Sequence, residues 1–229
     1  MKHIERLKKT NSQKLQETII DIEQIRKLIL NNQIFLHQCK IKGVDFSLIE
    51  SLIDLLKYRL FIGILFADFC SSLNIYFKAQ TLYEEKFALR SLLIVINEGV
   101  KKIYNFENIN SEGYINQKER NNSFWMKEVK PIVQSEARGF SEHYDAITQK
   151  LDEFLLHDFN RIKIDRNLSI HYDKNPMLLY KMIINLDLDE KLPLILDFMK
   201  VIDEMFHFTE ILGKHLYENF DDIIDKIHR

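Results

Sequence analysis

Glycine and proline are scarce in this chain, with six glycines and three prolines in 229 residues. Proline interrupts helices and strands, and both residue types dominate the tight turns that join β-strands. A chain this poor in turn residues favours long helices with few connections over many short strands. We therefore expect an all-α protein, and its 46% hydrophobic and 29% charged residues are ordinary for a globular domain.

Apolar residues recur at helical spacing along most of the chain. Ser47 with Glu50, and Thr81 with Glu84, have the spacing of a capping box, which predicts two helix starts, although one continuous helix is an alternative. Gly43 is a natural stop for the preceding helix. The expected helices cover residues 12–42, 47–77, 81–104, 141–156 and 177–184, with a last helix that has Pro193 in its first turn and extends to about Tyr217.

The segment 105–122 lacks periodicity and is rich in Asn, Ser and Gly, which predicts a long loop. Loops of this length are often functional. Trp125 opens the next helix, where we expect it to pack in the core; a platform for base stacking is the alternative. Pro131 and Gly139 are expected to break the helical pattern before residue 141.

Cys39 and Cys70 have neither the spacing of a metal site nor that of a disulfide framework, which suits a reducing cytoplasm. The charged N-terminus is not followed by the apolar region of a signal peptide. The most apolar window, residues 58–77, is interrupted by Arg59, Asp68 and Asn74. We expect a buried helix there and no membrane association, with a membrane span as the alternative.

Residues 158–176, DFNRIKIDRNLSIHYDKNP, are the part of the chain whose residue types call for a chemical explanation. Asp165 is a good helix N-cap, so Arg166 and Asn167 would lie in a first helical turn, where backbone N–H groups favour anions. His171 shares a helix face with Asn167 and titrates near neutral pH. A guanidinium, an amide and an imidazole within six positions suit a phosphate. The alternative is a chance pairing, with His171 at the core edge.

The pattern Arg166-Asn167-x-x-x-His171 resembles the R-x(4-6)-H signature of the HEPN superfamily, and Tyr172 and Asp173 continue the likeness. The resemblance implies an up-and-down helical bundle that forms a homodimer, with two motifs facing one cleft. Many members are metal-independent endoribonucleases of toxin–antitoxin and phage-defence systems. Others are inactive and bind nucleotides or proteins, which is the alternative function here.

A length of 229 residues suits one large domain or two small ones, and one domain is the simpler interpretation. Residues 1–229 would then form a single domain, with 1–43 as an extra N-terminal helix and 44–229 as the HEPN-like core. The resemblance also implies a mechanism. A ribose 2′-hydroxyl would attack the adjacent phosphate and leave a 2′,3′-cyclic phosphate. His171 would move protons, Arg166 would stabilise charge, and Asn167 would orient the phosphate or the histidine. No metal or other cofactor is implied, and the partners would be RNA or a nucleotide, a second copy, and an antitoxin protein.

Glu98, in LLIVINEGVKK, is the candidate supporting residue. HEPN domains often carry an acidic residue on an earlier helix near the motif, where it could orient His171 or hold Arg166; Arg90 is a weaker companion. The alternative is a half-exposed glutamate paired with Lys102, which would contribute at most a few tenths of a kcal/mol.

The formal net charge of −2 argues against a protein that holds nucleic acid along an extended phosphate backbone. Cations exceed acids slightly in residues 158–176, so we expect any RNA contact to be local. The cations there are Arg161, Lys163, Arg166 and Lys174, and the acids are Asp158, Asp165 and Asp173.

A di-metal helical bundle needs two Glu-x-x-His pairs with two further glutamates. One such pair occurs, Glu204 with His207, and we interpret it as part of a polar helix face.

Overall fold

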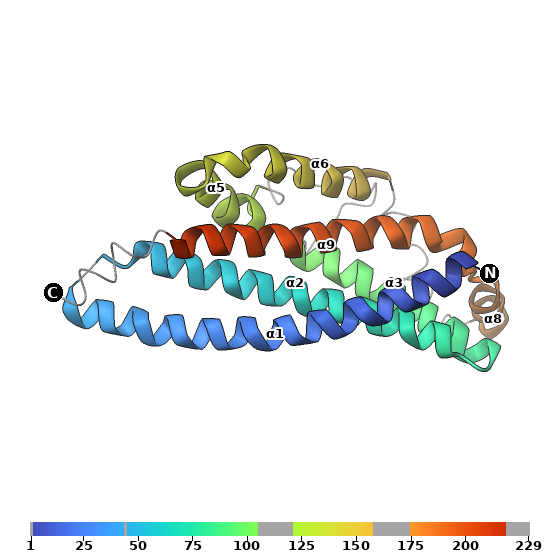
Figure 1. The fold of residues 1–229 in the computed structure, drawn as a ribbon. Coiled ribbons are helices and arrows are strands. Elements are labelled where there is room, and N and C mark those ends of the chain that lie inside the picture. The colour runs from blue at the N-terminus through green and yellow to red at the C-terminus, as the bar shows by residue number, and fades with distance from the viewer. Residues whose placement is uncertain (1, 44, 105–120, 158–174, 219–229) are drawn as a thin grey trace.

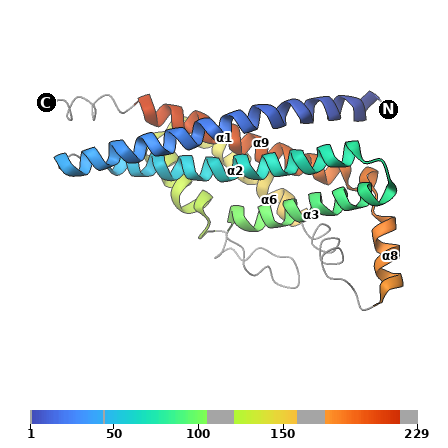
Figure 2. The same ribbon diagram turned by 90° about the horizontal axis from the view of Figure 1, so that it is seen from below.

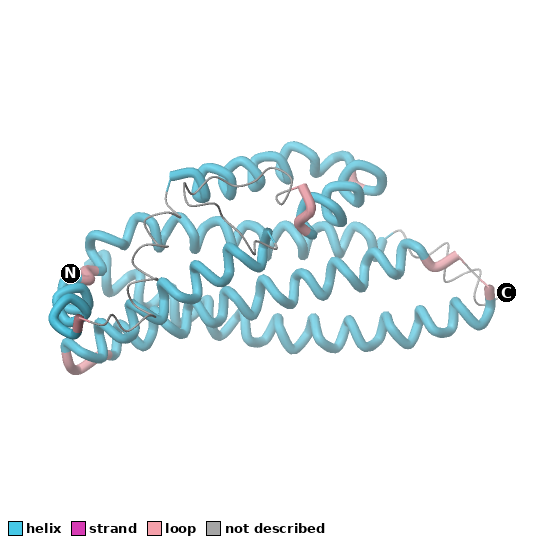
Figure 3. Tube along the Cα trace, turned by 180° about the vertical axis from the view of Figure 1, so that it is seen from behind, coloured by secondary structure: helices cyan, strands magenta, loops and turns pink. Residues whose placement is uncertain are grey.

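The computed structural model describes residues 2–43, 45–104, 121–157 and 175–218 (Figure 1). Every regular element in these ranges is a helix (Figure 3), which confirms the expected all-α class. In chain order the elements are α1 (Lys2–Lys42), α2 (Ser47–Lys78), α3 (Leu82–Tyr104), the π-helical turn η1 (Trp125–Val129), α5 (Lys130–Glu136), the 3-10 turn η2 (Arg138–Phe140), α6 (Ser141–His157), α8 (Pro176–Asn185) and α9 (Leu188–Glu218).

The helices form an elongated bundle with α2 at its centre. Helix α2 runs antiparallel to α1 and contacts α1, α3 and α9 (Figures 1 and 2). Helix α6 lies along the outer side of α9, and α8 crosses one end of the bundle. By length and composition α2 is the one helix of the described ranges that could cross a membrane, and a core helix passes the same test. Its residues Phe69, Cys70 and Leu73 are fully buried here.

Helix α1 packs in the manner of a coiled coil. Buried residues recur every seven positions at Asn11, Thr18, Ile25, Asn32 and Cys39, which is the spacing of a coiled-coil seam. The buried asparagines find partners on other helices: the Asn11 amide donates to the Cys70 carbonyl, at 2.8 Å, and the Asn32 amide donates to the Tyr217 hydroxyl. Buried polar groups need such partners, so these two bonds favour one register of α1 against α2 and α9.

The start of α1 differs from the expectation. The helix begins at Lys2, ten residues before the expected start at residue 12. Residues 2–11 carry little apolar periodicity, but Asn11 and Ser12 both donate to the Asn74 side chain of α2, at 2.9 and 3.1 Å. At the other end, Gly43 has a φ of 66°, the left-handed conformation expected of a helix stop.

The two predicted capping boxes have different outcomes. The Thr81 box is confirmed, since the Glu84 carboxylate accepts from the Thr81 N–H at 2.9 Å while the Thr81 hydroxyl accepts from the Glu84 N–H. Helices α2 and α3 are therefore separate. The prediction of a capping box at Ser47 is wrong. Phe46 occupies the N-cap of α2, and no side chain forms a capping hydrogen bond there. Glu50 instead pairs with Lys40 of α1, at 3.0 Å.

Two of the three prolines lie elsewhere in their helices than predicted. Pro131 was expected to break the helical pattern, but it does not. It lies in the first turn of α5, directly after η1, where a missing N–H is tolerated. Pro193 lies inside α9 rather than in its first turn, because the helix already begins at Leu188. The carboxylate of Asp187 accepts from the Asp189 N–H at 3.0 Å and supports that earlier start.

Trp125 is fully buried, which confirms core packing and excludes a base-stacking platform. Its indole stacks on Tyr144 with ring centroids 4.9 Å apart, and its N–H donates to the Thr148 hydroxyl at 2.8 Å. This cluster fixes α6 against η1. The remaining expected helices, 141–156 and 177–184, are confirmed as α6 and α8.

Candidate functional site

The predicted catalytic residues Arg166, Asn167 and His171 lie outside the described residues, as does most of the predicted loop 105–122. Their assignment therefore stays a prediction. Glu98, the predicted supporting residue, is described, and so is its whole helix.

The Glu98 carboxylate is held in place from its own helix. Its Oε1 accepts from the Asn97 amide at 2.9 Å and from the Lys101 ammonium at 2.9 Å. The expected partner was Lys102, but the structure pairs Glu98 with Lys101, one position earlier. The Glu98 side chain remains 46% exposed, whereas Asn97 is fully buried. The buried amide thus anchors a carboxylate that is half-exposed.

Glu98 precedes Gly99, where α3 packs tightly against α2. A Cβ atom added to Gly99 would lie 2.5 Å from Cδ1 of Leu65, a residue of α2. The packing at this position therefore favours glycine, because a larger residue would force the Leu65 side chain or the helices to move. The same close approach fixes the position of the Glu98 backbone relative to the core.

The face of α3 that carries Glu98 also carries two cations. Arg90, Ile94, Glu98 and Lys101 are spaced three or four residues apart and so share one face of the helix. Lys102 follows on the adjacent strip of the helix surface and is exposed. By formal charge this side of α3 carries three cations and one carboxylate, and such a positive excess attracts phosphate.

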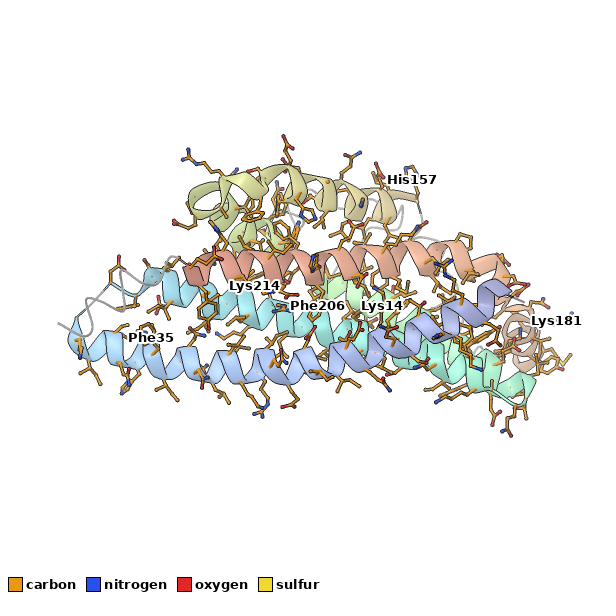
Figure 4. All side chains as sticks on the ribbon, viewed as in Figure 1. Lys14, Phe35, His157, Lys181, Phe206 and Lys214 are labelled. Carbon is orange, nitrogen blue, oxygen red and sulfur yellow. The ribbon has the colours of Figure 1, made fainter. Side chains whose placement is uncertain are left out.

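A second feature, which the sequence analysis missed, is a groove of about 380 Å³ lined by residues of α1, α2, α6 and α9. Figure 4 labels Lys14, Phe206 and Lys214 in this region. Five carboxylates line the groove together with one lysine, Lys14. They are Glu17, Asp21, Asp203, Glu204 and Glu210.

The carboxylates of this groove are partly neutralised by cations from neighbouring helices. Arg59, from the apolar centre of α2, is buried and pairs with Glu210 at 3.2 Å while its guanidinium lies 5.0 Å from the Phe206 ring centroid. Desolvation lowers the pKa of Arg59, and Glu210 opposes that shift. Burial raises the pKa of Asp21, although the Arg59 charge opposes it.

The groove is unsuited to nucleic acid, because its carboxylates would repel phosphates. Within the described ranges no cluster of three or more His, Cys, Asp or Glu side chains is arranged to hold a metal ion. Glu204, of the Glu-x-x-His pair, instead accepts from Lys150 through both carboxylate oxygens, each at 2.7 Å. The groove escaped sequence analysis because its residues come from four helices. The one signal was Arg59, a charge in the most apolar window that required a buried partner.

Comparison with known proteins gave no relative: no family model matches the sequence, no curated protein resembles it, and no solved structure matches the fold.

Proposed function

We propose that the chain is a metal-independent endoribonuclease of the HEPN type. The observation that carries the proposal is the pattern Arg166-Asn167-x-x-x-His171 in an all-helical chain. The protein acts in the cytoplasm as a homodimer on RNA. A role in a toxin–antitoxin or phage-defence system adds an antitoxin protein as a partner.

Each residue of the motif has a role that its chemistry suits. His171 takes the proton of the attacking 2′-hydroxyl and returns a proton to the leaving 5′-oxygen, for which a pKa near neutrality is favourable. Arg166 stabilises the negative charge that develops on the phosphorus oxygens. Asn167 orients the phosphate or the imidazole. The products are a 2′,3′-cyclic phosphate and a 5′-hydroxyl.

One described feature supports this proposal, and a second limits where RNA can bind. The face of α3 that carries Glu98 offers a half-exposed carboxylate among Arg90, Lys101 and Lys102, a setting suited to positioning a cationic residue beside a phosphate. The acidic groove, in contrast, is a poor phosphate site, so RNA contact is confined to other surfaces.

The proposal is tested with purified protein and mixed single-stranded RNA in the presence of EDTA, with the product ends mapped. We expect cleavage that leaves cyclic-phosphate ends and is lost in Arg166→Ala/His171→Ala. The matched control is Arg161→Ala, which removes a nearby positive charge outside the motif and should leave cleavage largely intact. Absence of cleavage by a folded wild-type protein would refute the proposal and favour the alternative, a non-catalytic HEPN module that binds nucleotide or protein.

Glu98 is tested by a pair of variants. Glu98→Gln removes the charge of the carboxylate, whereas Lys101→Ala removes its ion-pair partner and keeps the carboxylate. We expect Glu98→Gln to slow cleavage more than Lys101→Ala, with little effect of either on stability, because a half-exposed i,i+3 pair contributes only about 0.2–0.5 kcal/mol. Equal rates for the two variants would show that Glu98 has no role beyond its ion pair.

A further inference from the structure

Helix α8 is almost entirely apolar and yet poorly packed. Its sequence is PMLLYKMIIN, and Asn175 caps its start by accepting from the N–H groups of Met177 and Leu178. No other described helix packs closely along it. Its Met177, Leu178 and Tyr180 side chains are between 46% and 63% exposed. A helix with apolar residues on most sides is normally buried, so the exposed side of α8 is suited to contact with another surface.

The start of α3 exposes a second group of apolar side chains at the same end of the bundle (Figures 1 and 2). Leu82, Tyr83 and Phe87 are between 51% and 63% exposed. The buried Lys86 ammonium donates to the Leu186 carbonyl and so ties the end of α8 to this part of α3. We call the six exposed residues of the two helices the α3/α8 patch.

The α3/α8 patch is large enough to be an interface. Because one aromatic side chain buries roughly 150–250 Å², the six partly exposed side chains offer on the order of 600 Å². This is at the upper limit of about 300–600 Å² for the largest apolar patch of a typical monomer. It also approaches the roughly 800 Å² that each partner contributes to a standard interface. Four of its six residues are of types enriched at interfaces, namely the aromatic residues Tyr83, Phe87 and Tyr180 and the methionine Met177.

We propose that two copies of the chain associate through the α3/α8 patch. The patch has two halves on different helices, so a two-fold axis can place α8 of each copy on the α3 half of the other. Charge supports this pairing. Lys181 projects from α8 at the end of the molecule (Figure 4), and Glu84 is exposed on α3, so the two halves of the patch carry opposite charges that suit contact with each other. The inference rests on the proposed function insofar as that function requires a dimer.

The first experiment measures the mass of the full-length protein by sedimentation equilibrium over a wide range of concentrations. We expect a dimer for the wild type. Phe87→Asp and Tyr180→Asp should each raise the dimer dissociation constant by about 30-fold or more, as for an aromatic hot spot. The matched control is Ile34→Asp on α1, which replaces a side chain that is 62% exposed. Ile34 adjoins Phe35, which Figure 4 labels far from Lys181. Circular dichroism checks that each variant is folded.

Cysteine crosslinking tests the reciprocal arrangement without disrupting the patch. The two native cysteines, Cys39 and Cys70, are fully buried, so an introduced surface cysteine is the reactive thiol. A Tyr180→Cys chain mixed with a Phe87→Cys chain should form the mixed disulfide on oxidation, whereas Ile34→Cys chains should not crosslink.

A wild-type protein that stays monomeric, a dimer unaffected by both aspartate substitutions, or equal crosslinking by Ile34→Cys would overturn the inference. The outcome is independent of the nuclease assay. A dimer that uses the patch but does not cleave RNA would refute the proposed activity alone.

Discussion

Gly99→Ala tests whether the close approach of α2 and α3 fixes the helix that carries Glu98. The added Cβ would lie 2.5 and 2.8 Å from the two methyl carbons of Leu65, which is buried, so the Leu65 side chain or the helices must move. Overpacking of this kind costs about 1–3 kcal/mol. Replacing glycine by alanine inside a helix returns about 0.5–1 kcal/mol. We therefore expect a net destabilisation of about 0.5–2 kcal/mol.

The assay is urea denaturation followed by circular dichroism, with Gly139→Ala as the matched control. A Cβ atom at Gly139 meets no atom within 4 Å, so that substitution should be neutral or slightly stabilising. The double variant Gly99→Ala/Leu65→Ala isolates the contact. Leu65→Ala alone leaves a cavity and costs about 2–5 kcal/mol, and the new methyl group at position 99 should fill part of it. The double variant should therefore be more stable than the two single effects predict together.

A Gly99→Ala protein as stable as Gly139→Ala would refute the reasoning. So would strict additivity in the double variant, because the predicted contact between positions 65 and 99 would then carry no energy.

Three further predictions concern other parts of the bundle. Thr148→Val removes the acceptor of the buried Trp125 N–H and should cost about 1–3 kcal/mol in thermal or urea unfolding; an unchanged midpoint would contradict this. Tyr217→Phe removes the bond from the buried Asn32 amide and should cost about 0.5–1.5 kcal/mol, measured the same way. Hydrogen bonds from the backbone hold the pKa of Glu84 below its ordinary value. The ionised Glu84 carboxylate therefore stabilises the folded protein at neutral pH, and this stabilisation is lost as pH falls through the lowered pKa. The stability difference between wild type and Glu84→Ala should shrink below about pH 4, and a difference constant with pH would contradict it.

Local patterns in the sequence predicted the helices well, because their causes lie within a few residues of each other. The Thr81 and Glu84 pair and the Gly43 stop are confirmed for this reason. The Ser47 and Glu50 pair has the same spacing, but Glu50 is taken by Lys40 of the preceding helix. A contact between helices therefore determines whether Glu50 forms the capping box, which the local sequence pattern does not.

Features that depend on contacts between several helices could not be predicted from local sequence patterns. The early start of α1 depends on Asn11 and Ser12 meeting Asn74 of α2. The acidic groove gathers residues from α1, α2, α6 and α9. The exposure of α8 is of the same kind, because its apolar sequence by itself indicates a buried helix. The proposed catalytic motif is a prediction from the sequence alone, and Glu98 is the one residue of the candidate site that lies in the described part of the chain.

The measurement that tests the central claim most directly is the single-turnover rate of RNA cleavage by His171→Ala, compared with wild type in EDTA at neutral pH. Removal of the group that transfers protons should slow cleavage by about 10²- to 10⁴-fold, with the protein still folded. Cleavage by His171→Ala at the wild-type rate would contradict the account.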